Sequence, residues 1–406
     1  MEQIINQDST IPSEVILSVE KIDRSGSTAS TSSLALPLPE ELSTSLVIRT
    51  ARKMKRLKPI NFSILRWNLF WLFLIWVVVA LPIWLRYASN CLVTFYVILV
   101  VQCWLDLVWL LAILFSVYYL VTLHYGMKAD HRLRYPQNSP KIYHLLILTI
   151  YKDDMEVIYR TVDSIAAQSE ASSVIMVLAW ESRTPDREQR TSLMQERYKD
   201  VFAHLLFTVH PYGLDNEVAS KAANANWGLR EAVKFMFVDQ NHQNIDHFMV
   251  TTCDADTLFH PKYFESLTAD YLVMLSKQDA NIHRTIWQAP LFYNWNLDQS
   301  SFITRITGLL RTTMTMGLLI PYNVNPMSCF SFSLTLAIRG GYWHPQIFMD
   351  DVGYLLTMMI GTQQRIRIRC LPVPVRSGPT SGETWLKDMH EWYIQVRRWG
   401  LGKYYK

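Results

Sequence analysis

Two long apolar runs precede a region in which short apolar runs alternate with amphipathic segments. Residues 67–85 contain no charged residue, and residues 91–123 contain only Asp106. At a rise of about 1.5 Å per residue, each run is long enough for a hydrocarbon core of roughly 30 Å. The pattern predicts two transmembrane helices within residues 65–123, the second of them tilted or extended into the cytosol.

From about residue 141 the pattern changes to that of an α/β domain, predicted over 141–406. Alternating strands and helices favour a largely parallel sheet, in which ligands bind at the carboxyl ends of the strands. The predicted strands are 144–150, 174–179, 205–209 and 248–252, and the predicted helices include 155–168 and 221–237.

Charge around the apolar runs predicts their orientation. Residues 1–60 form a Ser-, Thr- and Pro-rich tail that we expect to be disordered, ending in a basic cluster. Basic residues also follow the second run, at Lys128, Arg132 and Arg134. Both flanks are therefore expected on the cytoplasmic side, which makes the chain a multi-pass integral membrane protein whose α/β domain faces the cytosol. Asp106 could line a polar path or bond to the neighbouring span.

Composition excludes two other classes of protein. The net charge of +4 is too small and too scattered for a nucleic-acid partner. The five cysteines form no CxxC pair, which indicates a reducing compartment and no zinc site.

Three short motifs follow in order along the domain. Asp254-Ala255-Asp256 comes directly after a predicted strand, Asp350-Asp351 comes later, and residues 395–399 read Gln-Val-Arg-Arg-Trp. Paired carboxylates suit Mg²⁺ or Mn²⁺ shared with substrate phosphates. One Asp-x-Asp is weak evidence, but the ordered set points to an enzyme that acts on a diphosphate.

The ordered set resembles the family 2 inverting glycosyltransferases, in the membrane-embedded branch that includes cellulose, chitin and hyaluronan synthases. The resemblance covers roughly residues 65–406, and Gln395 to Trp399 is its most specific motif. His210, Lys221 and the stretch from Gly340 to Trp343 look closer to a less-studied set of family 2-like membrane proteins. The resemblance implies a GT-A-like, Rossmann-like mixed sheet.

The resemblance also implies how the donor is bound. Asp256 would hold Mg²⁺ or Mn²⁺ with help from Asp254, which could instead reach the ribose or base. Lys221 would meet the phosphates, although Ser220 stands where the family often has Gly. Asp153 would contact the base or ribose, and Glu181 the nucleobase, unless it belongs to a surface loop.

An inverting transfer needs a general base, and the resemblance assigns that role to Asp351. Asp350 would support it, standing where the family usually has Glu. The alternative is a solvated pair of acids at a helix N-terminus. In the last motif Arg398 would neutralise the diphosphate and Trp399 would stack on a sugar, beside Gln395 and Arg397; packing is the alternative for this motif.

The resulting hypothesis is a membrane-bound transferase that adds sugar from a nucleotide-sugar, in particular a UDP-sugar, to a growing glycan, as in polysaccharide synthesis. The expected partners are the donor, a glycan or lipid-linked acceptor, and membrane lipids. Two alternatives stay open: a single transfer to a lipid-linked acceptor, and a non-catalytic scaffold with a degenerate fold. Because the sequence ends soon after Trp399, we expect either a fragment or an incomplete translocation channel.

Overall fold

The structure is a computed structural model that describes residues 91–294, 302–347, 349–378 and 385–401. The predicted tail and basic cluster, residues 1–60, and the first apolar run, residues 67–85, lie outside the described residues.

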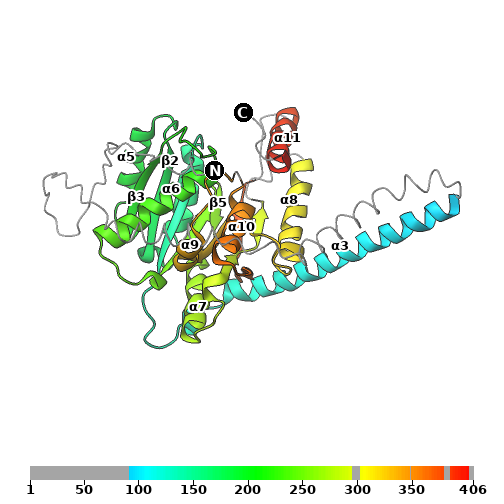
Figure 1. Cartoon of the computed structure of the whole chain (residues 1–406), viewed down its shortest axis with the longest axis horizontal. Coiled ribbons are helices and arrows are strands. Elements are labelled where there is room, and N and C mark those ends of the chain that lie inside the picture. The colour runs from blue at the N-terminus through cyan, green and yellow to red at the C-terminus, as the bar shows by residue number, and fades with distance from the viewer. Residues whose placement is uncertain (1–90, 295–301, 348, 379–384, 402–406) are drawn as a thin grey trace, which may run out of the picture. The chain divides into compact units, whose positions relative to one another are not determined.

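A seven-stranded sheet forms the centre of the α/β region, in the order β3-β2-β1-β4-β8-β6-β9 (Figure 1). β3, β2, β1 and β4 are all parallel, whereas β8 runs antiparallel to both of its neighbours, so the sheet is mixed. The four predicted strands are confirmed within two residues at each end. The strands are β1 (Tyr143–Ile150), β2 (Val174–Glu181), β3 (His204–His210), β4 (Phe248–Cys253), β6 (Thr285–Gln288), β8 (Phe330–Ser333) and β9 (Arg367–Cys370).

Helices cover both faces of this sheet, which explains why its central strands are apolar throughout. Leu146 and Leu148 of β1 point into the core on the side of α4 and α7, while Leu145 and Ile147 point into the core on the side of α6, α9 and α10. These helices are α4 (Met155–Ala166), α6 (Lys221–Lys234), α7 (Tyr263–Ser276), α9 (Leu334–Gly340) and α10 (Asp350–Thr362).

A second, three-stranded sheet has the order β5-β10-β7, and the sequence did not predict it. β10 (Val375–Ser377) lies between β5 (Thr257–Phe259), which is antiparallel to it, and β7 (Leu291–Tyr293), which is parallel. Because β5 begins directly after Asp256, this small sheet brings the end of β10 beside the Asp-x-Asp motif.

The second apolar run forms one helix, α3 (Cys91–Lys128), of 38 residues. Its part Tyr96–Lys128 is long and apolar enough to cross a membrane. At 1.5 Å per residue the whole helix is about 57 Å long, which exceeds a roughly 30 Å hydrocarbon core. Asp106 accepts a hydrogen bond from Gln102 of the same helix, at 2.8 Å.

The C-terminal part of α3 packs against α8 (Phe302–Met314) and the π-helical turn η7 (Thr315–Leu319). The hydroxyl of Ser116 donates to the carbonyl oxygen of Thr313 at 3.1 Å, and Gly317 lies directly against the backbone of Ala112. α8 buries Thr304 and Thr312 but exposes Ile306, Leu309, Leu310 and Met314.

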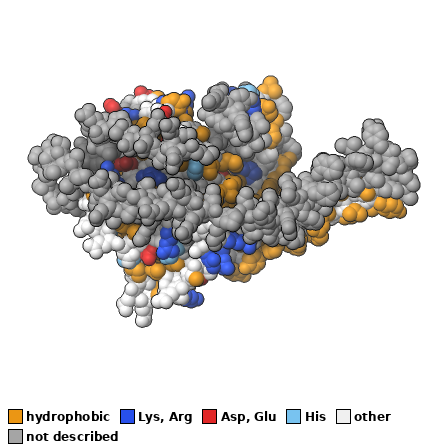
Figure 2. Space-filling view, in the orientation of Figure 1, with side chains coloured by type: hydrophobic (Ala, Val, Ile, Leu, Met, Phe, Trp, Pro, Cys, Tyr) orange, Lys and Arg blue, Asp and Glu red, His pale blue; other side chains and the backbone are white. Residues whose placement is uncertain are grey.

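Exposed hydrophobic side chains of α3 form a band along its lower edge in Figure 2. The exposed apolar face of α8 is typical of an interfacial helix rather than of an ordinary core helix.

Candidate active site

Parallel strands place three predicted acidic residues at one edge of the large sheet. Asp153 follows β1, Glu181 ends β2 and Asp254 follows β4. The amide N–H of Tyr151 donates to Asp153 Oδ2 at 3.1 Å, and Arg190 donates to the Asp153 carbonyl oxygen at 2.8 Å. Burial raises the pKa of Asp153, and the nearby Asp254 carboxylate raises it further.

Asp256 is held by the turn that follows β10. Its Oδ2 accepts from the Ser377 hydroxyl and from the Gly378 amide, each at 3.1 Å. Burial raises the pKa of Asp256 to about 7, with Asp254 as the second cause. Burial and the neighbouring carboxylate thus disfavour the bare charge of Asp256, and a bound cation would compensate that charge.

The second acidic pair begins α10. The indole nitrogen of Trp343 donates to the Asp350 carbonyl oxygen at 3.0 Å, and the Trp343 ring packs 4.6 Å from the Tyr354 ring. Asp351 Oδ1 accepts from the Val352 amide at 2.7 Å. Burial and the neighbouring Asp350 raise the pKa of Asp351 to about 6. Both acids lie in the first turn of α10 and are partly buried.

One lysine joins the two acidic motifs. Lys221 Nζ lies 2.7 Å from Asp254 Oδ1 and 2.6 Å from Asp350 Oδ2. Burial by itself lowers the pKa of Lys221, but the two carboxylates outweigh it and hold that pKa well above the usual value. The side chain is thus an ammonium ion at neutral pH.

The position of Lys221 follows from a helix cap. Ser220 is the N-cap of α6, and its hydroxyl oxygen accepts from the Ala223 amide at 3.2 Å. The serine hydroxyl satisfies a backbone donor of the first helical turn, which glycine could not do, and this explains why α6 starts at Lys221.

Tyr293 is a site residue that the sequence did not indicate. Burial is the main cause that raises the pKa of its phenol to about 12. The negative charges of Asp254 and Asp256 also raise this pKa. The hydroxyl accepts from Arg311 Nη2 at 2.8 Å, and the same guanidinium lies 3.8 Å from the ring centroid. No local signal marked this residue, because only the small sheet brings the end of β7 to the acidic motif.

Glu181 pairs with Arg183 at the end of β2. The Arg183 guanidinium lies 3.7 Å from the ring centroid of Tyr212 and 5.0 Å from that of Tyr151. Glu181 is therefore part of a charged and aromatic cluster rather than an isolated surface residue.

The last motif lies on α11 (Trp385–Leu401), which packs on α8 through Trp392, whose indole donates to the Thr307 hydroxyl at 3.2 Å. Gln395 is half-buried and Arg397 is exposed, while the side chains of Arg398 and Trp399 lie outside the description. The roles of these four residues stay predictions.

The donor set is suited to a hard divalent cation. Asp153, Asp254 and Asp256 interact electrostatically, and Lys221 balances Asp254 and Asp350 together. In the described part of the chain, no three His, Cys, Asp or Glu side chains form a complete metal cluster. Mg²⁺ and Mn²⁺ sites with one or two carboxylates obtain their other ligands from phosphates and water, and Asp254 with Asp256 fits that pattern.

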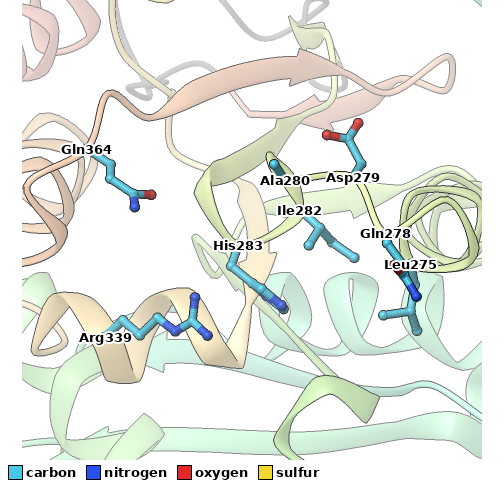
Figure 3. A pocket seen from close by; sticks show the side chains of 8 residues that line it. All are labelled: Leu275, Gln278, Asp279, Ala280, Ile282, His283, Arg339 and Gln364. Atoms are coloured by element: carbon cyan, nitrogen blue, oxygen red, sulfur yellow. The ribbon is translucent and has the colours of Figure 1, made fainter.

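A cavity of about 330 Å³ lies away from these residues (Figure 3). Its lining includes His283, which precedes β6, and Arg339 of α9. Because β6 starts where the cavity lies, the cavity is at the edge of the sheet opposite the acidic motifs. It contains none of the predicted site residues.

No known family model matches the sequence, and no curated protein is similar to it. The chain is similar to the crystal structure of TarS 1–349 from S. aureus, at 14% identity and a TM-score of 0.37, over 58% of this chain and 60% of that one. The complex of TarS 1–349 with UDP is similar at 14% identity and a TM-score of 0.37, over 59% and 61%.

The chain is also similar to the mannosyltransferase PcManGT from Pyrobaculum calidifontis, in complex with GDP-Man and Mn²⁺. The identity is 15% and the TM-score 0.39, over 72% of this chain and 73% of that one. Likenesses this remote carry no inference about function, which has to come from the residues of the site.

Proposed function

We propose that this chain is a membrane-bound inverting glycosyltransferase of GT-A type that transfers a sugar from a nucleotide-sugar, in particular a UDP-sugar. One observation carries the proposal. Two acidic motifs far apart in the sequence meet on the single ammonium of Lys221, at the carboxyl edge of parallel strands. Such an edge is where α/β sheets bind their ligands.

Each residue then has a role that fits its chemistry. Asp256 and Asp254 would hold Mg²⁺ or Mn²⁺, which acts as a Lewis acid toward the leaving diphosphate when bound. Asp153 and Glu181 would contact the nucleoside. Gln395, Arg397, Arg398 and Trp399 would serve the diphosphate and the acceptor.

Asp351 would take the proton from the acceptor hydroxyl. Its pKa of about 6 leaves it ionised at neutral pH, yet basic enough to accept a proton in the transition state. Burial places this carboxyl away from bulk water, and the charge of Asp350 keeps its basicity high.

The membrane part of the proposal rests on α3, the described helix that is long and apolar enough to cross a bilayer. With the first apolar run, residues 67–85, it would make two spans. The acceptor would be a growing glycan or a lipid-linked sugar.

A ligand screen by thermal unfolding tests the proposal, because a ligand that binds the folded state raises its stability. We expect UDP to raise the melting temperature only with Mn²⁺, and Asp256→Ala to abolish that rise. Asp200→Ala, which removes an exposed carboxylate ahead of β3, is the matched control. A folded protein that no nucleoside diphosphate stabilises would favour the non-catalytic scaffold instead.

A further inference from the structure

Three polar side chains of α4 and its C-terminal extension lie on one helical face. Thr161, Ser164 and Gln168 are spaced by three and four residues, which places them above one another along the helix. All three bond to the backbone of residues 255–263, the segment that begins inside the Asp-x-Asp motif.

The bonds are spread along that segment. The Thr161 hydroxyl donates to the Ala255 carbonyl oxygen at 2.5 Å, and Ser164 Oγ accepts from the Phe259 amide at 3.1 Å. Gln168 uses both ends of its amide: Nε2 donates to the His260 carbonyl oxygen at 2.8 Å, and Oε1 accepts from the Tyr263 amide at 3.1 Å.

The first of these bonds lies closest to the chemistry. Ala255 separates the two aspartates, so its carbonyl orientation sets the plane of the peptide that leads into Asp256. Thr161 is fully buried, which leaves its hydroxyl no water to bond with in place of Ala255. Opposite this anchor, Ser377 and Gly378 hold the carboxylate of Asp256 itself.

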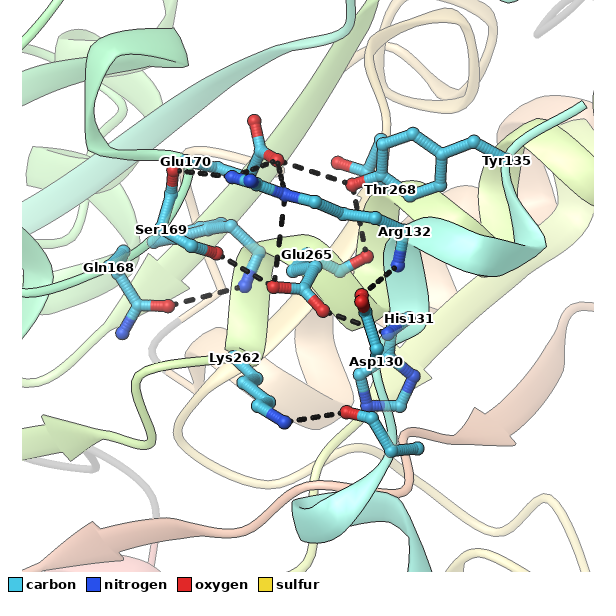
Figure 4. Close-up of polar contacts among 12 residues, drawn as sticks. Asp130, His131, Arg132, Tyr135, Gln168, Ser169, Glu170, Lys262, Glu265 and Thr268 are labelled. Carbon is cyan, nitrogen blue, oxygen red and sulfur yellow. Dashed lines mark hydrogen bonds and ion pairs between the residues drawn. The ribbon is translucent and has the colours of Figure 1, made fainter. Parts of the chain in front are cut away.

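Polar contacts next to Gln168 lead on to the residues that follow α3 (Figure 4). Ser169, next to Gln168, donates to Glu265 Oε2 at 2.9 Å. Glu265 Oε1 in turn accepts at 2.8 Å from the amide of His131, the first residue of η1 (His131–Arg134), which follows α3. Glu265, two residues beyond the segment 255–263, therefore joins the end of α4 to the turn that follows α3.

We propose that Thr161, Ser164 and Gln168 are positioning residues that orient Asp256 toward Asp254 for the cation and diphosphate. The inference rests on the proposed function, and none of the three touches the substrate. They act through the backbone of 255–263, with Thr161 as the decisive anchor because its partner is the residue between the two aspartates.

Three substitutions separate positioning from simple packing. Thr161→Val keeps the shape but removes the hydroxyl, which leaves the Ala255 carbonyl without its buried partner. Thr161→Ser keeps the hydroxyl. Ile158→Val, in the apolar core of the same helix, lowers stability but keeps every hydrogen bond from α4 to the segment.

The measurement is Mn²⁺ binding to the full-length protein with UDP present, followed by the loss of the free Mn²⁺ signal in electron paramagnetic resonance. We expect Thr161→Val to bind Mn²⁺ about tenfold more weakly, and Thr161→Ser and Ile158→Val to bind within about twofold of the native protein. Equal affinity of Thr161→Val and Ile158→Val would overturn the proposal. If Thr161→Val does not fold, Ser164→Ala replaces it.

Amide hydrogen exchange of residues 254–262 tests the positioning role independently of the proposed function, because it does not depend on Mn²⁺ binding. If the native protein itself binds no Mn²⁺, the proposed function fails, but the exchange measurement still decides whether α4 orders the segment. Faster exchange there in Thr161→Val, and not in Ile158→Val, would support the positioning role. Unchanged exchange would refute it.

Discussion

Lys221 Nζ lies 2.6 Å from Asp350 Oδ2, so the first residue of α6 meets the first residue of α10. The same nitrogen lies 2.7 Å from Asp254 Oδ1. A single cation thus balances one carboxylate from each acidic motif. A diphosphate that reached this nitrogen would compete with both carboxylates for the positive charge.

Lys221→Met should destabilise the protein. Both carboxylates would lose their counter-ion in a partly buried site, since only 23% of the Lys221 side chain is exposed, and we expect a loss of about 1–3 kcal/mol. Chemical denaturation at pH 8 measures it. Asp350→Asn should recover part of the loss in the Lys221→Met background, and Lys152→Met, on an exposed lysine, is the control. Equal stability of the two lysine variants would contradict the coupling.

The rate of transfer should depend on pH through Asp351. Burial and Asp350 raise the pKa of this base to about 6, and only its ionised form accepts a proton, so the rate should fall about tenfold per pH unit below 6. Asp350→Asn removes the neighbouring charge and should move the acid limb to lower pH. If the acid limb of the pH–rate profile moved to higher pH in that variant, Asp350 would not raise the pKa of Asp351.

Asp351→Asn should separate catalysis from binding. The loss of a general base lowers the rate by about 10²–10⁴-fold, whereas the residues assigned to the donor are unchanged. Product formation measures the first effect, and stabilisation by UDP with Mn²⁺ measures the second. Asp200→Asn is the control for a lost surface charge. A variant that retains full transfer would remove Asp351 from the mechanism.

Asp256→Asn should stabilise the metal-free protein above neutral pH. The folded-state pKa of about 7 lies above the usual 3.8, so the folded protein holds this proton more tightly than the unfolded chain and loses stability as pH rises from 4 to 7. Asparagine removes the buried charge, which we expect to add on the order of 1–2 kcal/mol at pH 8 and little at pH 4. Thermal unfolding at both pH values checks this, and a lower melting temperature at pH 8 would contradict it.

Gly317→Ala should weaken the contact between α3 and η7. A Cβ at this position would overlap the carbonyl oxygen of Ala112, and backbone on both sides leaves little room to adjust. We expect a loss of about 1–3 kcal/mol, measured by thermal unfolding in detergent. Leu309→Ala, on the exposed face of α8, should change stability far less. Equal effects would mean that the close approach at Gly317 is not needed.

The sequence by itself determined four strands of the large sheet, β1 to β4, and the helices α4 and α6, but not β6, β8 and β9. The apolar runs of β1 and β2 are continuous because these strands are buried on both faces. It also placed Asp254 correctly at the end of a strand, at the edge where parallel strands end. The length and apolar character of the second run were enough to predict the helix α3.

Tertiary structure alone decided which of these residues meet. The strands β5, β7 and β10 are only three residues long, too short for a periodic pattern, yet they bring Ser377 and Tyr293 to the Asp-x-Asp motif. The ion pairs of Lys221 depend on where α6 and α10 pack on the sheet. Packing in three dimensions decides which distant segments make contact, and a local sequence pattern does not contain that information.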